Sequence, residues 1–569
     1  MENSSVKAWS EQDDSESSPS DVIQNEHSES VINLESDPLT NDGISFDEMD
    51  AEDEEGKKVL QGRMTCCLLF ASIAASLSSL QYGYHLGVVN SPASIMKDWY
   101  KVSFFRLHGV HISDTMTDVL WATSVSIYAF GAIFGGLVTG WLADNIGRKK
   151  TLLLNNILVF VSTALTSSAK YVDVLYLIII GRLIIGFNCG INSNLVPLYL
   201  TEIAPINYRG TVGTLHQLAI VFSIGAALVM GLPYIFGNEL LWPMLFVTAL
   251  VPAVLQLLSL TFCPESPKFT IVMKGNDNQA EKDLRRLRGK CDVSKELAKI
   301  KEEAAVAKAQ PKVSYCDMFR AKYRWPLAIA LILVISRQLA GINAISFYST
   351  SIFDQAGLKG KLPALASAGL GVVMVLVTIF SAFMVDSKCC GRRPLLLSGL
   401  AGCCLSLVLL TVSMSFAKSL ESIVLQTWAG YCSVAFVVLF IIMWSWGIGP
   451  VPWFYVTELF HYNARGRASS LASMSNWTST FIIGLSYPPL NDWLRQYTFL
   501  IYAAISAATF VFTLLAVPET KGKTTDEILH EIKSNPLHKV ATRFKIKERL
   551  MLDVGGSAGR KGGGKQPKL

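Results

Sequence analysis

A short motif that combines a tyrosine, a threonine and a glutamate occurs twice along the chain. It reads Tyr-Leu-Thr-Glu-Ile at 199–203 and Tyr-Val-Thr-Glu-Leu at 455–459. Seven residues after each glutamate an Arg-Gly pair follows, at Arg209 and Arg465. A carboxylate and a guanidinium can form charge-assisted hydrogen bonds, so the chemistry that these residues offer is ion pairing.

Two further motifs are duplicated in the same order. An aspartate followed by Gly-Arg-Lys at 144–149 recurs as an aspartate followed by Gly-Arg-Arg at 386–393, and Pro-Glu-Ser at 264–266 recurs as Pro-Glu-Thr at 518–520. Three motifs repeated at an offset of about 250 residues indicate two homologous halves. Duplicated halves with a binding site at their interface are a transporter architecture.

The duplicated acids and arginines predict an inter-helix latch whose ion pairs form in one conformational state and break in the other. The alternative is that they are only solvated charges, since exposed pairs contribute about 0–1 kcal/mol. Duplication at matching positions favours the latch. Its candidate members, predicted to form a cytoplasmic gate, are Arg148, Arg182, Glu202, Arg209, Arg392, Arg393, Glu458 and Arg465.

The composition identifies the elements that must position these residues. Of the 569 residues, 51% are hydrophobic and 17% are charged, whereas about 25% are charged in an ordinary soluble domain. The deficit lies in long apolar runs that read as transmembrane helices, which excludes a soluble enzyme, a collagen-like fibre and a disulfide scaffold. The runs and breakers predict twelve spans, near 65–87, 118–142, 151–168, 173–197, 211–233, 242–262, 325–353, 364–385, 394–416, 423–447, 467–487 and 497–517.

Charge predicts the orientation and the domain organisation. Lys and Arg cluster on alternate connections, and because basic loops stay on the cytoplasmic side, both termini are predicted to be cytoplasmic. The basic C-terminal tail should attract anionic membrane lipid, and nucleic acid is not expected as a partner. The predicted parts are an acidic disordered tail at 1–58, a six-helix half at 59–263, a cytoplasmic helical linker at 264–323, a second six-helix half at 324–520 and a basic cytoplasmic tail at 521–569.

Four helix breakers lie at the end of the tenth predicted span and just beyond it, and break its helix there. Gly447, Gly449, Pro450 and Pro452 fall within six residues. Proline removes a backbone hydrogen bond and clashes with the preceding turn, and such breaks persist in a membrane where they line a cavity. The cluster therefore predicts a hinge, with a packing kink as the alternative.

Several motifs between about residue 60 and residue 528 are shared with one known family. They are GRK at 147–149, GRLIIG at 181–186, PESPKF at 264–269, QLAGINAISFYSTSIF at 338–353, GPVPWF at 449–454, NWTS at 476–479 and PETKGKT at 518–524. On these motifs the chain resembles the facilitative glucose transporters, the sugar-porter branch of the major facilitator superfamily. The resemblance implies an all-α membrane fold of twelve helices in two six-helix halves, alternating access, a monosaccharide substrate, no cofactor and a place in the plasma membrane.

The resemblance also implies a central substrate site of amides and indoles, which suit the hydroxyls and the apolar ring face of a neutral sugar. For each residue the alternative is structural, because an intramembrane amide can simply bond a neighbouring helix for about 0.6 kcal/mol. The two tryptophans could likewise be interfacial or core aromatics. The residues that match the family are Gln217, Ile220, Gln338, Ile342, Asn343, Trp453, Asn476 and Trp477.

Four positions depart from the family pattern and are candidates for specificity. Arg337 lies about 18 Å into its helix, where an unpaired charge costs at least about 2.5 kcal/mol. In the favoured interpretation it bonds carbonyls or a hydroxyl; in the other it faces the substrate and selects an anion, as some members of the family carry urate. The departures are Arg337 for a glutamine, Met374 for an asparagine, Ser445 for a glutamate and Thr480 for an asparagine.

His85, on the first span, is a further candidate for specificity. Proton-coupled sugar porters place an aspartate at this position, whereas facilitative members have an asparagine. A histidine could titrate near neutral pH, but a neutral hydrogen-bonding imidazole is favoured, and with it uniport over proton symport.

The sequence therefore predicts facilitative uniport of a hexose, D-glucose before others. Same-fold alternatives are a carrier of fructose or of an organic anion such as urate, and a proton-coupled sugar symporter. A non-transporting sugar sensor that signals through its tails is an alternative of another class. An enzyme is disfavoured because the sequence shows no Gly-rich phosphate loop, metal-ligand cluster or nucleophile–base pair.

Overall fold

The computed structural model is helical and, in the part that it describes, contains no β-strand. It describes residues 63–205, 208–289, 292–309, 313–386, 391–419, 422–521, 523 and 525–534. The predicted acidic tail and most of the predicted basic tail lie outside these ranges. Within these ranges ten stretches of helix are long and apolar enough to span a membrane, and a shorter apolar stretch covers Met244–Leu260.

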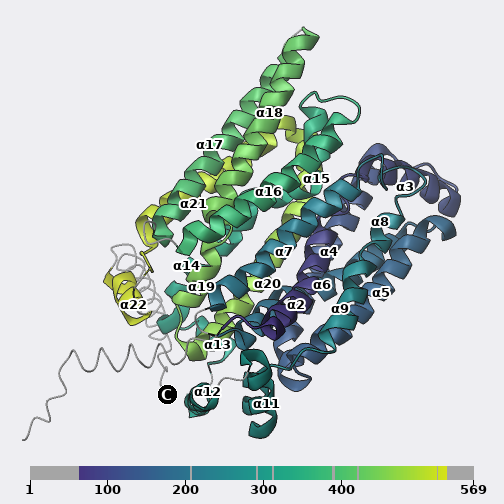
Figure 1. Ribbon diagram of the computed structural model, residues 1–569. Helices are drawn as coiled ribbons and strands as arrows, with labels where there is room; N and C mark the ends of the chain where they lie inside the picture. Colours follow the sequence, from purple (N-terminus) through teal and green to yellow (C-terminus); the bar gives the residue numbers. More distant parts are fainter. Residues whose placement is uncertain are drawn as a thin grey trace, which may run out of the picture. The chain divides into compact units, whose positions relative to one another are not determined.

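The helices fall into two halves, which Figure 1 shows as neighbouring groups. The first half consists of α2 (Cys66–Gly87), α4 (Asp114–Asn145), α5 (Arg148–Val172), α6 (Tyr176–Ile203), α7 (Arg209–Met230), α8 (Met244–Val247) and α9 (Leu250–Leu260). The second half consists of α14 (Ala321–Leu339), α15 (Ile342–Gln355), α16 (Leu362–Asp386), α17 (Arg392–Ser419), α18 (Ile423–Met443), η2 (Trp444–Ile448), α19 (Val451–Glu458), α20 (Tyr462–Leu494), η3 (Arg495–Tyr497) and α21 (Thr498–Ala516). One of the ten long stretches, Ala464–Ala516, contains two helices, α20 and α21. Together with the shorter stretch Met244–Leu260, the described helices therefore occupy each of the twelve predicted spans.

The halves meet where α4 packs on α20 and where α7 packs on α16. Within the first half α4 and α6 lie so close that a Cβ on Gly186 would be 1.9 Å from the carbonyl oxygen of Tyr128. Small residues permit this close approach of membrane helices. Outward-facing apolar side chains such as Ile73 and Phe222 are more than half exposed, at 53% and 57%, as expected for a surface that contacts lipid.

Polar caps fix the starts of several helices. The hydroxyls of Thr65 and Ser113 accept hydrogen bonds from backbone N–H groups three residues on and so cap α2 and α4. Ser266 caps α10 (Pro267–Val272) in the same way, with proline in the first helical position.

The seventh predicted span is broken, which corrects its prediction as one continuous helix. The span ends as α14 at Leu339 and resumes as α15 at Ile342, and Gly341 between them has a φ of +101°. This left-handed backbone favours glycine, and a Cβ here would lie 3.0 Å from the ring of Tyr502. One glycine in an apolar run is a weak breaker signal, so the sequence did not reveal the break.

The tenth span is broken where its glycines and prolines predicted. After α18 the chain forms one turn of π-helix, η2, and α19 begins at Val451. The Trp453 N–H donates a hydrogen bond to the carbonyl oxygen of Pro450. In a regular α-helix it would donate to the carbonyl oxygen of Gly449 instead. The break is confirmed, and its service as a hinge stays a prediction.

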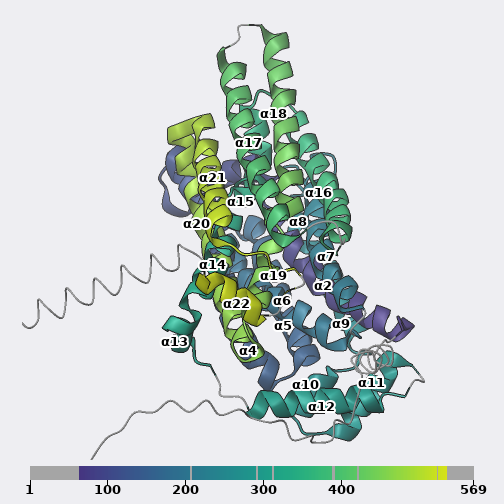
Figure 2. The same cartoon turned by 90° about the vertical axis from the view of Figure 1, so that its left-hand side faces the viewer.

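Shorter helices surround the spans. An unpredicted helix, α3 (Ala93–His108), connects α2 to α4. The linker contains α10, α11 (Asp277–Arg288), α12 (Ser294–Ala309) and α13 (Tyr315–Met318), and α10, α11 and α12 lie together at one end of the spans (Figure 2). A last helix, α22 (Thr525–Ser534), follows α21.

Candidate functional site

A cluster of polar side chains lies at the break between α14 and α15. Gln338 Nε2 donates a hydrogen bond to Asn476 Oδ1 at 2.6 Å, and Asn343 Nδ2 donates to Gln338 Oε1 at 3.1 Å. Asn343 Nδ2 also donates to Thr480 Oγ1 at 3.3 Å. All four residues are buried. The break thus brings two amides from its two sides against α20, and joins three predicted substrate residues to one predicted specificity residue.

Arg337 belongs to this cluster. Its Nε donates to the carbonyl oxygen of Gly449 at 2.8 Å, and its Nη1 donates to Asn476 Oδ1 at 3.0 Å. Its guanidinium carbon lies 4.9 Å from the centre of the Trp444 ring and 5.9 Å from that of the Trp453 ring. Among the described residues a carbonyl, an amide and two indole faces, and no carboxylate, stabilise the charge. These contacts agree with the favoured interpretation of Arg337.

Trp477, although next to Asn476 in sequence, faces the first half. Its ring centre lies 5.3 Å from that of Tyr82 and 5.8 Å from that of Tyr128. Its indole N–H donates to Ser193 Oγ at 3.3 Å. The structure therefore places Trp477 between the halves and apart from the amide cluster.

Other predicted site residues are not hydrogen-bonded to the amide cluster in the described part of the chain. Gln217 is half-buried on α7, and Ile220 is buried one turn further on. Ile342 is buried at the start of α15, and Met374 is buried in the core on α16. Ser445 lies in η2, where its carbonyl oxygen accepts a hydrogen bond from α16 at 2.9 Å.

The prediction that Arg182 belongs to the cytoplasmic gate was wrong about its position. It lies twenty residues before Glu202 on α6, which is about 30 Å along the helix. Its guanidinium donates to the carbonyl oxygen of His85 at 2.8 Å and lies 4.5 Å from the centre of the Tyr128 ring. The prediction grouped Arg182 with the basic motifs at helix ends, whereas its side chain is fully buried between spans.

His85 also differs from its prediction. The residue is buried, and neither ring nitrogen has a hydrogen-bond partner among the described residues. The hydrogen bond expected of a neutral imidazole is therefore not made to this part of the chain, and the role of His85 in specificity stays a prediction.

The first copy of the ion-pair motif is tight and buried. Arg148 Nε and Nη2 donate to the two carboxylate oxygens of Glu202 at 3.0 and 3.1 Å. The two side chains are 9% and 8% exposed. Ser266 Oγ donates to the same carboxylate at 2.5 Å. The pair therefore ties α5 and α6 to the start of α10.

The second copy is looser. Arg392 Nε lies 3.6 Å from Glu458 Oε1, and the side chains are 14% and 27% exposed. Arg393 donates to a backbone carbonyl of α21 at 2.7 Å. Arg209 and Arg465 are exposed and belong to no ion pair in the described ranges. Both observed pairs join helices of one half, so the latch itself stays a prediction.

Glu519, in the third duplicated motif, is an acceptor for four backbone N–H groups. Arg392, Arg393, Thr520 and Lys521 donate to its carboxylate at 2.9 to 3.0 Å. Burial acts to raise the pKa of this carboxyl, but the backbone hydrogen bonds outweigh burial and hold the pKa below its usual range. Glu519 is therefore held as an anion, and it fixes the start of α17 by accepting the N–H groups of Arg392 and Arg393.

A second amide network, which was not predicted from the sequence, lies in the first half. Gln81 Nε2 donates to Asn156 Oδ1 at 2.9 Å, Asn156 Nδ2 donates to Gln256 Oε1 at 2.9 Å, and Gln256 Nε2 donates to Ser78 Oγ at 2.6 Å. These residues come from α2, α5 and α9. The sequence offered one signal for this network, a polar amide residue in each of three apolar runs.

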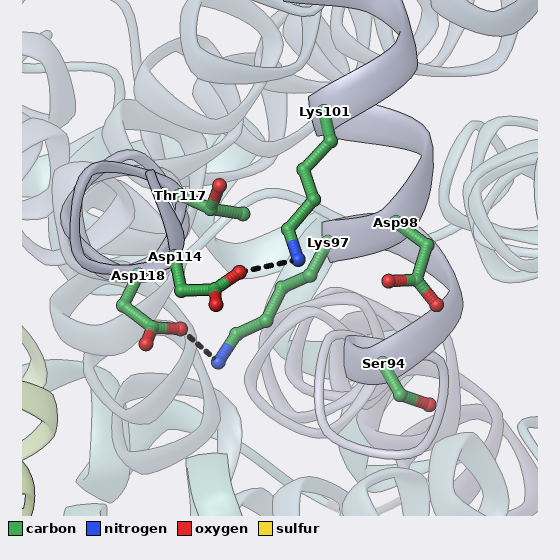
Figure 3. A pocket seen from close by; sticks show the side chains of 7 residues that line it. All are labelled: Ser94, Lys97, Asp98, Lys101, Asp114, Thr117 and Asp118. Carbon is green, nitrogen blue, oxygen red and sulfur yellow. Dashed lines mark hydrogen bonds and ion pairs between the residues drawn. The ribbon is translucent and has the colours of Figure 1, made fainter. Parts of the chain in front are cut away.

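A cavity of about 250 Å³ lies between α3 and α4 (Figure 3). Across it Lys97 pairs with Asp118, and Lys101 pairs with Asp114 at 2.6 Å. The cavity shares no residue with the amide cluster, and its ion pairs tie α3 to α4. It is lined by Ser94, Lys97, Asp98, Lys101, Asp114, Thr117 and Asp118.

Comparison with known proteins gives matches over most of the chain. A family model described as sugar (and other) transporter matches residues 71–531. Facilitated glucose transporter protein 1 of Caenorhabditis elegans is 43% identical over 470 residues, which cover 83% of this chain and 91% of that protein. Solute carrier family 2, facilitated glucose transporter member 1 of Gallus gallus is 38% identical over 472 residues, covering 83% and 94%.

A solved structure shares the fold. The inward-open xylose transporter XylE from E. coli has a TM-score of 0.66 and 22% identity, covering 82% of this chain and 99% of that chain. At this identity the likeness concerns the fold alone, and it agrees with twelve helices in two halves. With the family model and the relatives over four-fifths of its length, the chain belongs to the sugar transporter family, in the facilitative glucose transporter (solute carrier 2) branch of the major facilitator superfamily.

Proposed function

We propose that this protein carries a hexose, D-glucose before other sugars, across a membrane by facilitative uniport. The observation that carries the proposal is the buried cluster of Gln338, Asn343 and Asn476 at a helix break. Neutral amide donors and acceptors suit the hydroxyls of a neutral sugar. Relatives 43% and 38% identical to the chain are named facilitated glucose transporters, which supports the same cargo here.

Alternating access follows from two halves that move as bodies around a central site. The Arg148–Glu202 pair holds helix ends together in the first half, and the hydrogen bonds to Glu519 do so in the second half. Contacts of this kind within each half support movement of each half as a unit. Arg209 and Arg465 are exposed in this conformation. In our proposal each of them forms an ion pair with an acidic side chain of the opposite half when the cytoplasmic side closes.

We further propose a cellular membrane for the protein, a side of that membrane for its termini and a lipid partner for its basic tail. We place the protein in the plasma membrane with both termini in the cytoplasm, on the basis of the basic alternate connections. The basic tail would contact anionic lipid, and the protein would have no enzymatic activity. Epitope tags at both termini should be stained only in permeabilised cells.

Uptake into liposomes that contain the purified protein tests the transport proposal. We expect saturable D-glucose uptake that exceeds L-glucose uptake, equilibrates without accumulation and is unaffected by a pH gradient. Fructose and urate are tested beside it. Uptake of urate without any hexose, accumulation driven by a proton gradient, or D-glucose binding without flux would each contradict hexose uniport.

A further inference from the structure

We infer that Arg337 sets the hydrogen-bonding polarity of the substrate site, so that Asn476 meets the sugar as a donor and Asn343 meets it as an acceptor. The inference rests on the proposed function, because it takes these amides to bind the sugar. Arg337 acts here as a positioning residue, through the amides, and does not have to touch the sugar itself.

The contact with Arg337 fixes the orientation of the Asn476 amide. An amide side chain can be turned over with almost no change of shape, which exchanges its donor and its acceptor. A guanidinium has donors only. The Asn476 atom that lies 3.0 Å from Arg337 Nη1 must therefore be the oxygen. With Arg337 in place, Asn476 has a single orientation.

The orientation is passed on to two further amides. Gln338 reaches the same Asn476 oxygen at 2.6 Å, so it must present its NH₂ group there. Its Oε1 then faces Asn343, which must present Nδ2 at 3.1 Å. The Thr480 hydroxyl accepts from Asn343 Nδ2 as well, while its own proton goes to the backbone carbonyl of Asn476 at 2.9 Å. One donor-only residue thus orients three amides in series.

Arg337 can act as this reference because its own position is fixed. Its Nε is bonded to the carbonyl of Gly449, which the break in the tenth span deprives of its helical donor. Its backbone carbonyl accepts from the indole N–H of Trp444 at 3.1 Å, and its guanidinium carbon lies 4.9 Å from the centre of that ring. These contacts tie Arg337 to the backbone of Gly449, between η2 and α19, and to the side chain of Trp444 in η2.

The result is a site with a defined polarity. The contacts within the described residues use Oδ1 of Asn476 and Nδ2 of Asn343. The opposite ends of these amides, Asn476 Nδ2 and Asn343 Oδ1, are what a sugar can bond. A hydroxyl at Asn476 must then accept, and a hydroxyl at Asn343 must donate.

Deoxy and fluoro sugars test this polarity directly. Replacing a hydroxyl by hydrogen removes its donor and its acceptor, whereas fluorine keeps a weak acceptor and removes only the donor. Each monodeoxy- and monofluoro-D-glucose is used to compete with D-glucose uptake in liposomes. At the position that faces Asn476 we expect the fluoro sugar to bind about threefold to fivefold more tightly than the deoxy sugar, the lower part of the range for one hydrogen bond, because fluorine is a weak acceptor.

Three variants separate polarity from stability. Arg337→Lys keeps a donor-only group and should keep the fluoro-to-deoxy ratio. Arg337→Gln can present either end of its amide, so the ratio should fall below about twofold. Asn476→Asp keeps the acceptor that Arg337 and Gln338 bond but has no donor, so we expect the KM for D-glucose to rise about tenfold. The ratio is unaffected by loss of folded protein, because it compares two sugars on one sample.

The failure of this inference is distinguishable from failure of the proposed function. Equal ratios in the wild type and Arg337→Gln, or normal D-glucose uptake by Asn476→Asp, would overturn the inference while transport stands. If the wild type takes up no D-glucose, the proposed uniport fails. The fluoro-to-deoxy ratios of binding affinity are then measured by quenching of tryptophan fluorescence. Whether the ratio of the wild type exceeds that of Arg337→Gln still decides the polarity.

Discussion

The two halves bury similar amide side chains but bond them differently. In the first half Gln81, Asn156 and Gln256 bond one another and a serine across three helices. In the second half Asn476 accepts hydrogen bonds from the cation Arg337 and from Gln338, and Gln338 accepts one from Asn343 on the other side of a helix break. The first network bonds amides of three helices to one another and leaves Gln81 Oε1 buried without a partner in the described residues. The second lies at a helix break, where the contacts between described residues use neither Asn476 Nδ2 nor Asn343 Oδ1. Residue type alone therefore does not separate an amide that only bonds neighbouring helices from one that we propose to bind substrate.

The duplicated motifs show the same divergence. Tyr199 donates to the carbonyl of Pro264 at 2.6 Å, and Tyr455 donates to that of Pro518 at 2.8 Å, so this contact is preserved in both halves. The ion pairs beside them are not equal, since one is bidentate and buried and the other is 3.6 Å long and partly exposed. The first half thus has the tighter ion pair, and the second half has the looser pair and the breaks at Gly341 and after η2.

The largest expected difference between the halves lies in these ion pairs. Arg148→Met leaves a buried Glu202 without its guanidinium, which should lower stability by about 3–5 kcal/mol. Arg392→Met, its matched control, removes a longer and more exposed pair and should cost about 1 kcal/mol or less. The apparent melting temperature of the purified protein in detergent measures both. Equal losses in the two variants would show that the halves are not distinguished by these pairs.

Matched amide substitutions test the second difference. Gln256→Met leaves partners in the first-half network unpaired and should cost about 1–3 kcal/mol of stability, with an unchanged KM for D-glucose per folded molecule. Gln338→Met should raise that KM about tenfold, the factor for one hydrogen bond. Melting temperature and liposome uptake are read on the same preparations. If Gln256→Met changes KM as much as Gln338→Met, the first network belongs to the binding site as well.

The break at Gly341 provides a third comparison. An alanine there must adopt a φ of +101° and place its Cβ 3.0 Å from the ring of Tyr502, which should cost about 1–2 kcal/mol and slow uptake. Gly140, in continuous α4, has no atom within 4 Å of a built Cβ, so Gly140→Ala should be neutral or slightly stabilising. Uptake rate and melting temperature are compared. An unaffected Gly341→Ala would mean that this break does not depend on glycine.

Some of this arrangement could be predicted from the sequence. The break in the tenth span follows from four breakers in six residues, and the amide cluster follows from the shared motif that contains Gln338 and Asn343. The position of Arg182 and the direction of Trp477 could not be predicted, because they depend on how each helix is rotated against its neighbours. Spacing along a chain gives the face of a helix on which a residue lies, but not which helix covers that face.

The smallest effect is expected where the halves differ only at the surface. The connection between α2 and α4 forms a helix, α3, that is paired to α4 through Lys97 and Asp118, whereas the corresponding link between α15 and α16 has only residues 356–361. These two side chains are 31% and 28% exposed, so Lys97→Met should cost about 1 kcal/mol or less. The loss should shrink further in 1 M salt, where the screening length is about 3 Å. Melting temperatures at low and high salt measure it, with Lys97→Arg as the control that keeps the charge. A large loss that salt does not reduce would mean that α3 stabilises the first half by packing of the Lys97 stem, and that the ion pair contributes little.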